Sequence, residues 1–225
     1  MKHNLLVMCI DETDTSNPGQ WISDRAEYDL IYLCYSNDIE FYKYLQSFGK
    51  PVLRVHSGKW KNIKWFIDNF RIKQYEFYWF PDPDLIINIK DINKFFKIVN
   101  KNNFGLCQPS LTKNSICSHS FLRQKIGKDY RKVDFVEVMC PCFSRKILGE
   151  LLWTFDLSFS GYGLDILWAK YMICYVINSV SVCHPRDQNF VRRAIQKGFP
   201  KPEDELQEIT RKYNLNSERF LQCIH

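Results

Sequence analysis

The stretch EFYWFPDPD at residues 76–84 ends an apolar run with two carboxylates, Asp82 and Asp84, placed one residue apart. Its aromatic residues are typical of a buried strand, and the carboxylates follow where such a strand reaches the surface. Carboxylate oxygens are ligands that Mg²⁺ and Mn²⁺ prefer, and open α/β sheets bind ligands at the carboxyl ends of their strands. The stretch therefore favours a metal or nucleotide site, although Asp and Pro are also common in ordinary turns.

Short β-rich runs alternate with runs at helical spacing on both sides of this stretch, which is typical of a layered α/β sheet. Besides the run before Asp82, the pattern predicts strands at 5–10, 30–35, 52–55, 104–108, 135–139 and 174–182, the last as a strand or hairpin. It predicts helices at 39–45, 60–70, 92–99 with Asp91 as the cap, 144–154, 164–172 and 202–214. Residues 110–132 are polar with little periodicity, and such long excursions are frequently lids.

The composition is that of a core-forming globular chain, with 45% hydrophobic, 16% aromatic and 25% charged residues. At 225 residues we expect one domain. A formal charge of +6 without a concentrated basic stripe suits a phosphorylated ligand and argues against a nucleic-acid partner.

The first apolar run, 5–10, is too short for a signal-peptide core or a membrane span. We therefore expect no membrane span. Nine cysteines without a secretory signal indicate a reducing compartment, so the expected localisation is cytoplasmic.

Two more polar residues follow an apolar strand or a glycine turn. Asp165 ends the stretch SGYGLD at 160–165, and His184 follows the apolar run 180–183. A metal held by carboxylates and an imidazole, with a separate carboxylate nearby, suits a reaction at a diphosphate. Each residue alone has a simpler explanation, since His184 can be a hydrogen-bonded surface histidine and Asp165 a helix N-cap.

Four further residues are candidates for substrate contacts. Arg54 and Lys59 follow the predicted third strand, where they either contact phosphate or are solvated. Gln108 and Glu137 are polar groups in otherwise apolar strands, where they contact a sugar or make a core hydrogen bond.

The motifs at 135–145, 160–165 and 182–184 resemble, in the same order, the plant and bacterial domain family labelled lysine-ketoglutarate reductase trans-splicing related. In that family an acidic triplet followed by Leu ends a strand, and a Gln-Pro dipeptide lies downstream. Asp82-Pro83-Asp84-Leu85 and Gln108-Pro109 occupy those places here. Pro83 replaces the middle acidic residue, so the outer two carboxylates carry over. The resemblance covers about residues 75–186, half of the chain.

The resemblance implies a single GT-A type glycosyltransferase domain, similar to those of large algal viruses, in which a Rossmann-related, mostly parallel α/β sheet is flanked by helices. Carried over, Asp84 is a direct ligand of Mn²⁺ (or Mg²⁺), Asp82 a ligand or ribose contact, and His184 the third protein ligand. Gly163 belongs to the acceptor-side loop, and Asp165 is the base of an inverting enzyme. A reductase is not expected, because no Gly-x-Gly-x-x-Gly follows the first strand.

The implied partners are a nucleoside-diphosphate sugar donor and a glycan or other hydroxyl acceptor. The nucleotide-binding half would span about 1–110, the acceptor half about 111–190, and C-terminal helices about 187–225.

Two other functions stay open at this point. In a metal-dependent phosphoesterase or nuclease, Asp82, Asp84 and His184 would activate water, although such sites commonly use two metals and more carboxylates. A non-catalytic carbohydrate-binding domain would keep the fold without the chemistry.

Overall fold

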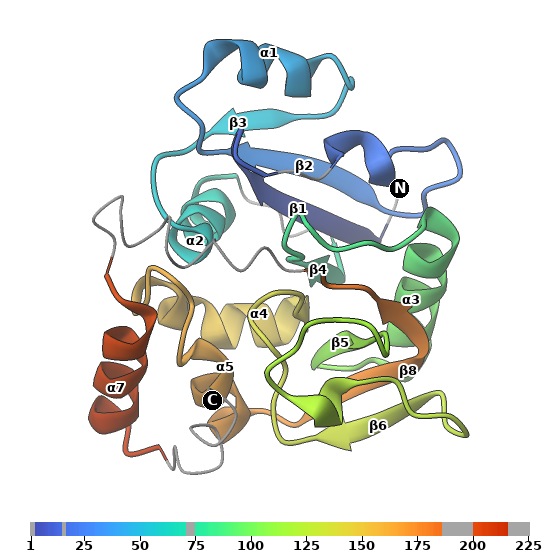
Figure 1. Ribbon diagram of the computed structural model, residues 1–225, viewed down its shortest axis with the longest axis vertical. Helices are drawn as coiled ribbons and strands as arrows, with labels where there is room; N and C mark the ends of the chain where they lie inside the picture. The colour runs from blue at the N-terminus through green and yellow to red at the C-terminus, as the bar shows by residue number, and fades with distance from the viewer. Residues whose placement is uncertain (1–2, 15–16, 71–74, 186–199, 216–225) are drawn as a thin grey trace.

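The computed structural model describes residues 3–14, 17–70, 75–185 and 200–215 (Figure 1). Eight strands form one sheet in the order β3-β2-β1-β4-β7-β5-β8-β6. Their bounds are β1 (Asn4–Ile10), β2 (Asp29–Cys34), β3 (Val52–Arg54), β4 (Phe77–Trp79), β5 (Leu106–Leu111), β6 (Tyr130–Val133), β7 (Cys142–Ser144) and β8 (Cys174–Val182). All except β6 and β7 point in the same direction, which confirms the predicted mostly parallel sheet.

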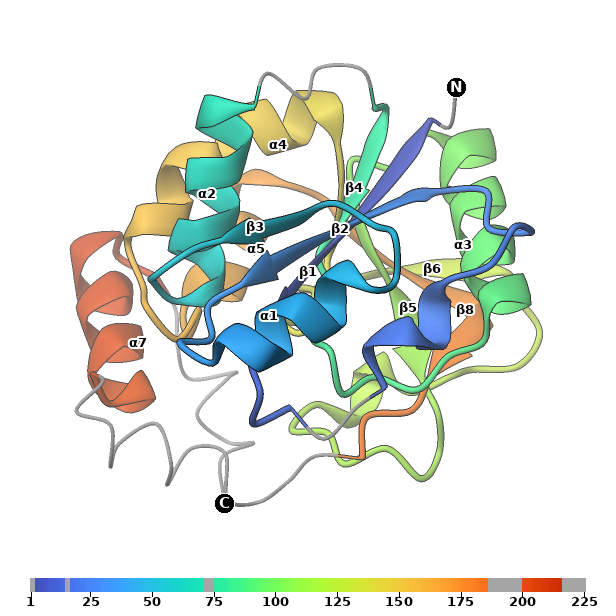
Figure 2. The ribbon, with the colours of Figure 1, turned by 90° about the horizontal axis from the view of Figure 1, so that it is seen from above.

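Helices cover both faces of this sheet (Figure 2). On one face, the buried side chains of α1 and α3 pack against the sheet. On the other face pack α2, α4 and α5, with α7 beside α5. The bounds are α1 (Ile39–Gln46), α2 (Lys59–Asn69), α3 (Ile89–Asn102), α4 (Arg145–Leu151), α5 (Leu164–Tyr171) and α7 (Pro202–Lys212). Within the described part of the chain, no helix combines the length and apolarity that crossing a bilayer requires.

Strand β1 lies at the centre of these layers, and all seven of its residues are buried. Leu6 and Met8 pack into the core under α3, whereas Leu5 and Val7 pack into the core under α2. A strand covered on both faces needs a continuous apolar run, which explains its sequence. Burying each such side chain contributes about 1.5–3 kcal/mol, so β1 fixes the position of the residues that follow it.

The strand predicted at 135–139 is wrong. These residues form no strand but a bend between β6 and β7, and β7 enters the sheet antiparallel between β4 and β5. Strands β6 and β7 run in the same direction, but β8 and β5 lie between them, so the chain has to cross from the edge of the sheet to its middle, which a continuous strand does not allow. Phe135, Val136 and Met139 are nevertheless buried. Apolar composition signals burial, and it does not separate a strand from a buried bend.

The polar excursion at 110–132 is folded onto the sheet. Its last residues form β6, which pairs antiparallel with β8 at the edge of the sheet. The backbone N–H of Ile116 donates to the carbonyl of His184 at 3.0 Å, and Gln124 Nε2 donates to the carbonyl of Asn178 at 2.8 Å. These contacts close the segment over β8.

The predicted cap of α3 is also corrected. Asn88 is the N-cap residue, and its side-chain oxygen accepts from the N–H of Asp91 at 2.9 Å. Asp91 lies in the first turn, where a negative charge stabilises the positive end of the helix dipole.

Candidate functional site

The carboxyl ends of β4 and β8 bring Asp84 and His184 together. The two strands are not neighbours, since β7 and β5 lie between them. A β-bridge links the loop after β4 to the end of β8, because Ile86 N–H donates to the carbonyl of Cys183 at 2.8 Å and Cys183 N–H donates back at 3.0 Å. As a result, His184 Nε2 lies 3.4 Å from Asp84 Oδ2.

The position of the proton on the His184 ring follows from the hydrogen bond that Nδ1 makes. Nδ1 lies 3.0 Å from the carbonyl oxygen of Ile116, which can only accept, so Nδ1 carries a proton and Nε2 faces Asp84. Burial acts to lower the pKa of His184, but the hydrogen bond and negative charge of Asp84 outweigh it, and the pKa is raised. Metal-binding histidines are typically oriented by this kind of bond from the second nitrogen.

Asp82 is paired with Lys59, the first residue of α2. Lys59 Nζ lies 2.6 Å from Asp82 Oδ1 and donates to the carbonyl of Val138 at 2.9 Å. Burial raises the pKa of Asp82 and the charge of Asp84 adds to this, while Lys59 acts in the opposite direction. Asp82 is therefore held as one half of a largely buried ion pair.

The fit of these residues to a divalent cation rests on Asp84. Its Oδ1 is buried and has no hydrogen-bond partner among the described residues, which leaves a hard oxygen ligand available beside His184 Nε2. The described residues contain no ready-made group of three or more His, Cys, Asp or Glu side chains able to hold a metal. Mg²⁺ sites commonly use one or two carboxylates and take further ligands from substrate phosphates. Asp84 and His184 fit such a cation, whereas Oδ1 of Asp82 is already taken by Lys59.

Asp165 lies in the first turn of α5, and Gly163 is the N-cap residue of that helix. The predicted alternative of Asp165 as the cap is therefore wrong. Gly163 has a φ of +87°, a conformation that favours glycine. Asp165 Oδ1 accepts from the N–H of Ile166 at 2.9 Å. Burial raises the pKa of Asp165 from 3.8 to about 7, although backbone hydrogen bonds act to lower it.

The glycine loop, residues 158–163, packs against the start of α2 and against Val138. A Cβ on Gly161 would lie 2.5 Å from Trp60 Nε1 and 3.4 Å from Val138 Cβ, and a Cβ on Gly58 would lie 2.6 Å from the carbonyl oxygen of Phe159. Val138 also accepts from Lys59. The glycine loop and the Lys59–Asp82 pair therefore contact the same two segments.

The remaining predicted substrate contacts lie around this centre. Gln108 is fully buried, and its Oε1 accepts from the N–H of Glu137 at 2.6 Å, so its amide braces the bend that replaces the predicted strand. Arg54 ends β3 on the same edge of the sheet, with its guanidinium 5.5 Å from the centre of the Tyr42 ring. The structure thus gives Gln108 a core hydrogen bond and leaves Arg54 exposed.

Two acidic residues at the end of β1 were missed as candidates. The N–H of Asp11 donates to Asp14 Oδ2 at 3.0 Å, and Thr13 N–H donates to Asp11 Oδ1 at 2.9 Å. Burial raises the pKa of Asp14 to about 7, and the negative charges of Asp82 and Asp84 also act to raise it. Asp14 therefore lies near Asp82 and Asp84, at the same edge of the sheet. The signal was present, because an apolar run followed directly by carboxylates is the pattern that identified Asp82.

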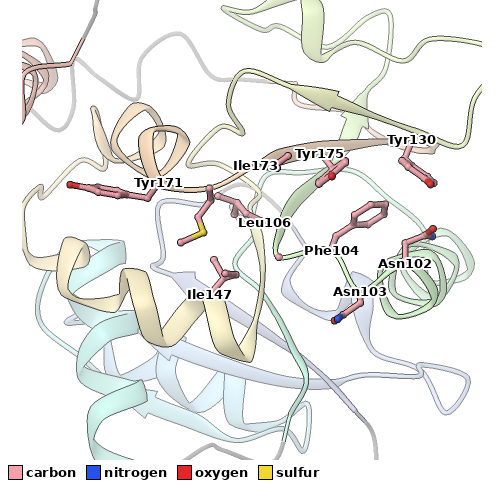
Figure 3. A pocket seen from close by; sticks show the side chains of 11 residues that line it. Asn102, Asn103, Phe104, Leu106, Tyr130, Ile147, Tyr171, Ile173 and Tyr175 are labelled. Carbon is pink, nitrogen blue, oxygen red and sulfur yellow. The ribbon is translucent and has the colours of Figure 1, made fainter.

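A cavity of about 560 Å³ lies elsewhere (Figure 3). Phe104 and Leu106 line it at the start of β5, and Tyr175 lines it at the start of β8. These are the amino ends of the strands, so the cavity is at the opposite edge from Asp84 and His184. It does not belong to the candidate site.

Comparisons with protein-family models and with curated proteins find no match for this chain. The resemblance to the trans-splicing related family therefore stays a prediction. Solved structures do match. Staphylococcus aureus TarS, residues 1–349, in complex with UDP-GlcNAc has a TM-score of 0.63 at 12% identity, over 92% of this chain and 64% of that one. GalNAc-T7 with UDP, GalNAc and Mn²⁺ has a TM-score of 0.57 at 9% identity, over 80% of this chain and 42% of that one.

A CMP-2-keto-3-deoxy-manno-octonic acid synthetase with CTP has a TM-score of 0.51 at 9% identity, over 91% of this chain and 99% of that one. This chain spans less than two thirds of the length of the TarS and GalNAc-T7 structures. At these identities the matches establish the fold. The chain is a single α/β domain with the fold of GT-A glycosyltransferases.

Proposed function

We propose that this protein transfers a sugar from a nucleoside-diphosphate donor to a hydroxyl acceptor with the help of a divalent cation. One observation carries the proposal. Asp84 places a buried oxygen without a hydrogen-bond partner, among the described residues, beside an imidazole oriented by Ile116, at the carboxyl edge of the sheet. Proteins of this fold have been solved with UDP-GlcNAc and with UDP and Mn²⁺.

In this proposal Asp84 and His184 hold Mn²⁺ or Mg²⁺, and the diphosphate supplies further oxygen ligands. The cation would supply charge stabilisation for the departing nucleoside diphosphate. Lys59 keeps Asp82 in place at 2.6 Å, where Asp82 contacts the ribose or the metal shell. Arg54 is the proposed phosphate contact from β3.

Asp165 is the proposed base. The acceptor oxygen forms a bond to the anomeric carbon, the bond from that carbon to the diphosphate breaks, and the acceptor proton goes to Asp165. A single displacement of this kind inverts the anomeric centre. A pKa of about 7 suits a base at neutral pH, since it combines a large deprotonated fraction with adequate basicity.

The acceptor half at about 111–190 carries the glycine loop. Glu137 stays a proposed sugar contact, and Gly163 stays a proposed substrate contact in the acceptor-side loop. The nucleotide-binding half at about 1–110 carries Asp82 and Asp84 at its β4 end.

The fold by itself does not fix this function, because the matched synthetase was solved with CTP and shares the same architecture. A panel of ligands is therefore part of the test. Isothermal titration of nucleoside diphosphates, their sugars and CTP, with and without Mn²⁺, would compare the wild type with Asp84→Asn. Asp24→Asn is the matched control, because Asp24 is exposed in the turn that precedes the amino end of β2.

We expect binding of one nucleotide class to require Mn²⁺, to be lost in Asp84→Asn, and to survive in Asp24→Asn. Release of nucleoside diphosphate from the sugar donor should then depend on an added acceptor. Binding that ignores both the metal and Asp84 would contradict the proposal and favour a non-catalytic carbohydrate-binding domain. Phosphate release from a diester without an acceptor would favour the phosphoesterase alternative.

A further inference from the structure

Glu205 on α7 binds the glycine loop through both oxygens of its carboxylate. Oε1 accepts from the backbone N–H of Phe159 at 2.5 Å, and Oε2 accepts from the N–H of Ser160 at 2.9 Å. Oε2 also accepts from the hydroxyl of Ser158 at 3.1 Å and from the hydroxyl of Ser160. One side chain from the end of the chain thus receives four hydrogen bonds from three consecutive residues.

The hydroxyls of Ser158 and Ser160 also accept hydrogen bonds from later residues of the loop. Ser158 Oγ accepts from the N–H of Gly161 at 2.8 Å, and Ser160 Oγ accepts from the N–H of Tyr162 at 3.2 Å. Each serine therefore donates to Glu205 and accepts from the backbone two or three residues ahead. Gly161 has a φ of +92°, so the loop takes a conformation that its local sequence does not enforce.

Ile209, one turn further along α7, contacts the other end of the loop. It is buried in the same core as Leu164 and Leu167 of α5. A Cβ on Gly163 would lie 3.2–3.4 Å from side-chain atoms of Ile209, so the two residues are in close contact. Gly163 is the N-cap residue of α5, the helix that carries Asp165. Helix α7 therefore holds the loop at its start through Glu205 and at its end through Ile209.

We propose that Glu205 is a positioning residue that fixes the glycine loop, and with it Asp165, for the transfer step. This inference rests on the proposed function, in which Asp165 is the base. Hydrogen bonds to an ionised carboxylate are about twice as strong as neutral ones, so Glu205 is well suited to hold a loop with two positive φ angles. A base in a fixed place avoids the entropic cost of finding its geometry in each turnover.

If Glu205 positions only the glycine loop, its loss should affect turnover and leave binding of the nucleotide unchanged. The metal and diphosphate site is built by Asp84 and His184 on the loops after β4 and β8, which Glu205 does not contact. Loss of Glu205 should lower kcat while the donor KM and the Mn²⁺-dependent affinity for the nucleotide stay unchanged. A misplacement of about 1 Å in a reacting group costs up to about 10²-fold in rate, which sets the expected size of the loss.

The test compares Glu205→Ala and Glu205→Gln with the control Glu208→Gln. Glu208 is exposed on the same helix, so its variant removes an equal charge without touching the loop. Hydrogen exchange measured by mass spectrometry over residues 158–163 reports the loop directly, and steady-state kinetics report the transfer step. The full chain is used in every case.

We expect faster exchange at the amides of Phe159 and Ser160 and a lower kcat in Glu205→Ala, with the control equal to wild type. Glu205→Gln keeps the shape and one accepting oxygen, so it should show a smaller loss, and it also serves if the alanine variant does not fold. Unchanged exchange in both variants overturns the positioning role whatever the protein catalyses.

Faster exchange with an unchanged kcat overturns the link to catalysis. A wild type that neither binds nor transfers a sugar removes the proposed function instead, and loop exchange still decides whether Glu205 holds the loop.

Discussion

The carboxylates of Asp165 and Asp82 differ in the groups that surround them. Asp82 has Lys59 at 2.6 Å, which stabilises its ionised form against burial. The pKa of Asp165 is raised from 3.8 to about 7 by burial, opposed by backbone N–H groups. Burial raises the pKa of both carboxylates, but Asp82 has a cationic partner that opposes this effect, whereas Asp165 has a pKa near neutral.

The first prediction concerns Asp165→Asn. If Asp165 is the base, kcat/KM of the wild type should rise with pH and level off above about 7, because only the ionised form accepts a proton. The variant should lose about 10²–10⁴-fold in rate and lose this dependence on pH. The measurement is a pH profile of donor consumption with acceptor present. A wild-type profile that is flat between pH 5 and 9 would exclude Asp165 as the base.

The same residue predicts a stability change with a definite sign. The folded protein holds the Asp165 proton with a pKa of about 7, against 3.8 as the ordinary value, so the folded state binds more protons in between. The contribution of this group to the free energy of unfolding is present below about pH 4 and is lost as the pH rises to about 7. Asp165→Asn should therefore melt above the wild type at pH 8 and level with it at pH 4, as calorimetry would show.

At the scale of elements, Gly161 decides how closely the glycine loop approaches α2. The residue has a φ of +92°, and a Cβ there would lie 2.5 Å from Trp60 Nε1 and 2.8 Å from Trp60 Cδ1. Trp60 is fully buried among Phe80, Phe155 and Trp168, so it has little room to move. The contact between loop and helix requires glycine on two counts, conformation and space.

Gly161→Ala and Gly127→Ala separate these two effects. Gly127 has a similar φ of +101°, and a Cβ there meets nothing within 4 Å. A positive φ costs a residue with a Cβ about 1–2 kcal/mol, which should be the whole effect at Gly127. Forcing a methyl group into a packed core adds about 1–3 kcal/mol at Gly161. Denaturant unfolding of both variants measures the difference, and equal losses would show that Trp60 gives way.

Elements were predicted well where their signal is local. The apolar run of β1 and the spacing of Trp60 and Ile63 in α2 are properties of neighbouring residues, and both elements were found where they were expected. The bend at 135–139 was taken for a strand because its residues are as apolar as those of a strand. Its conformation is set by Gln108, whose oxygen accepts from Glu137 at 2.6 Å across 29 residues.

At the scale of the whole molecule, a ligand at the carboxyl edge should stabilise the entire domain. The loops after β4 and β8 are joined through Ile86 and Cys183, so a cation with a diphosphate on Asp84 and His184 would hold strands from both halves of the sheet. A ligand that binds only the folded state stabilises it by about 2.7 kcal/mol at a concentration 100 times its Kd.

For a chain of this length that gain should raise Tm by roughly 5–10 °C. We expect the shift from UDP or another matching nucleotide together with Mn²⁺, and we expect EDTA to remove it. Thermal melts of the wild type beside Asp84→Asn make the measurement. A shift of equal size in the variant would place the ligand elsewhere in the molecule.

By itself, the sequence determined the class of the sheet and most of its strands and helices, and it supplied the candidate residues for which a site chemistry is proposed. Apolar runs, helical spacing and carboxylates after a strand are patterns among adjacent residues, and adjacent residues interact in any compact state of the chain. Those patterns identified Asp82, Asp84, Asp165 and His184 as candidates, but they did not say which of them meet.

The tertiary structure decided the partners. Lys59 reaches Asp82 across 23 residues, and Glu205 reaches Ser160 across 45. The order of the strands sets Asp84 against His184 although two strands lie between theirs. Contacts between residues so far apart in the sequence depend on how the chain crosses over the sheet. Patterns among neighbouring residues do not predict these crossings. For that reason the candidate residues follow from the sequence, whereas the ion pair, the oriented imidazole and the support of the glycine loop follow from the fold.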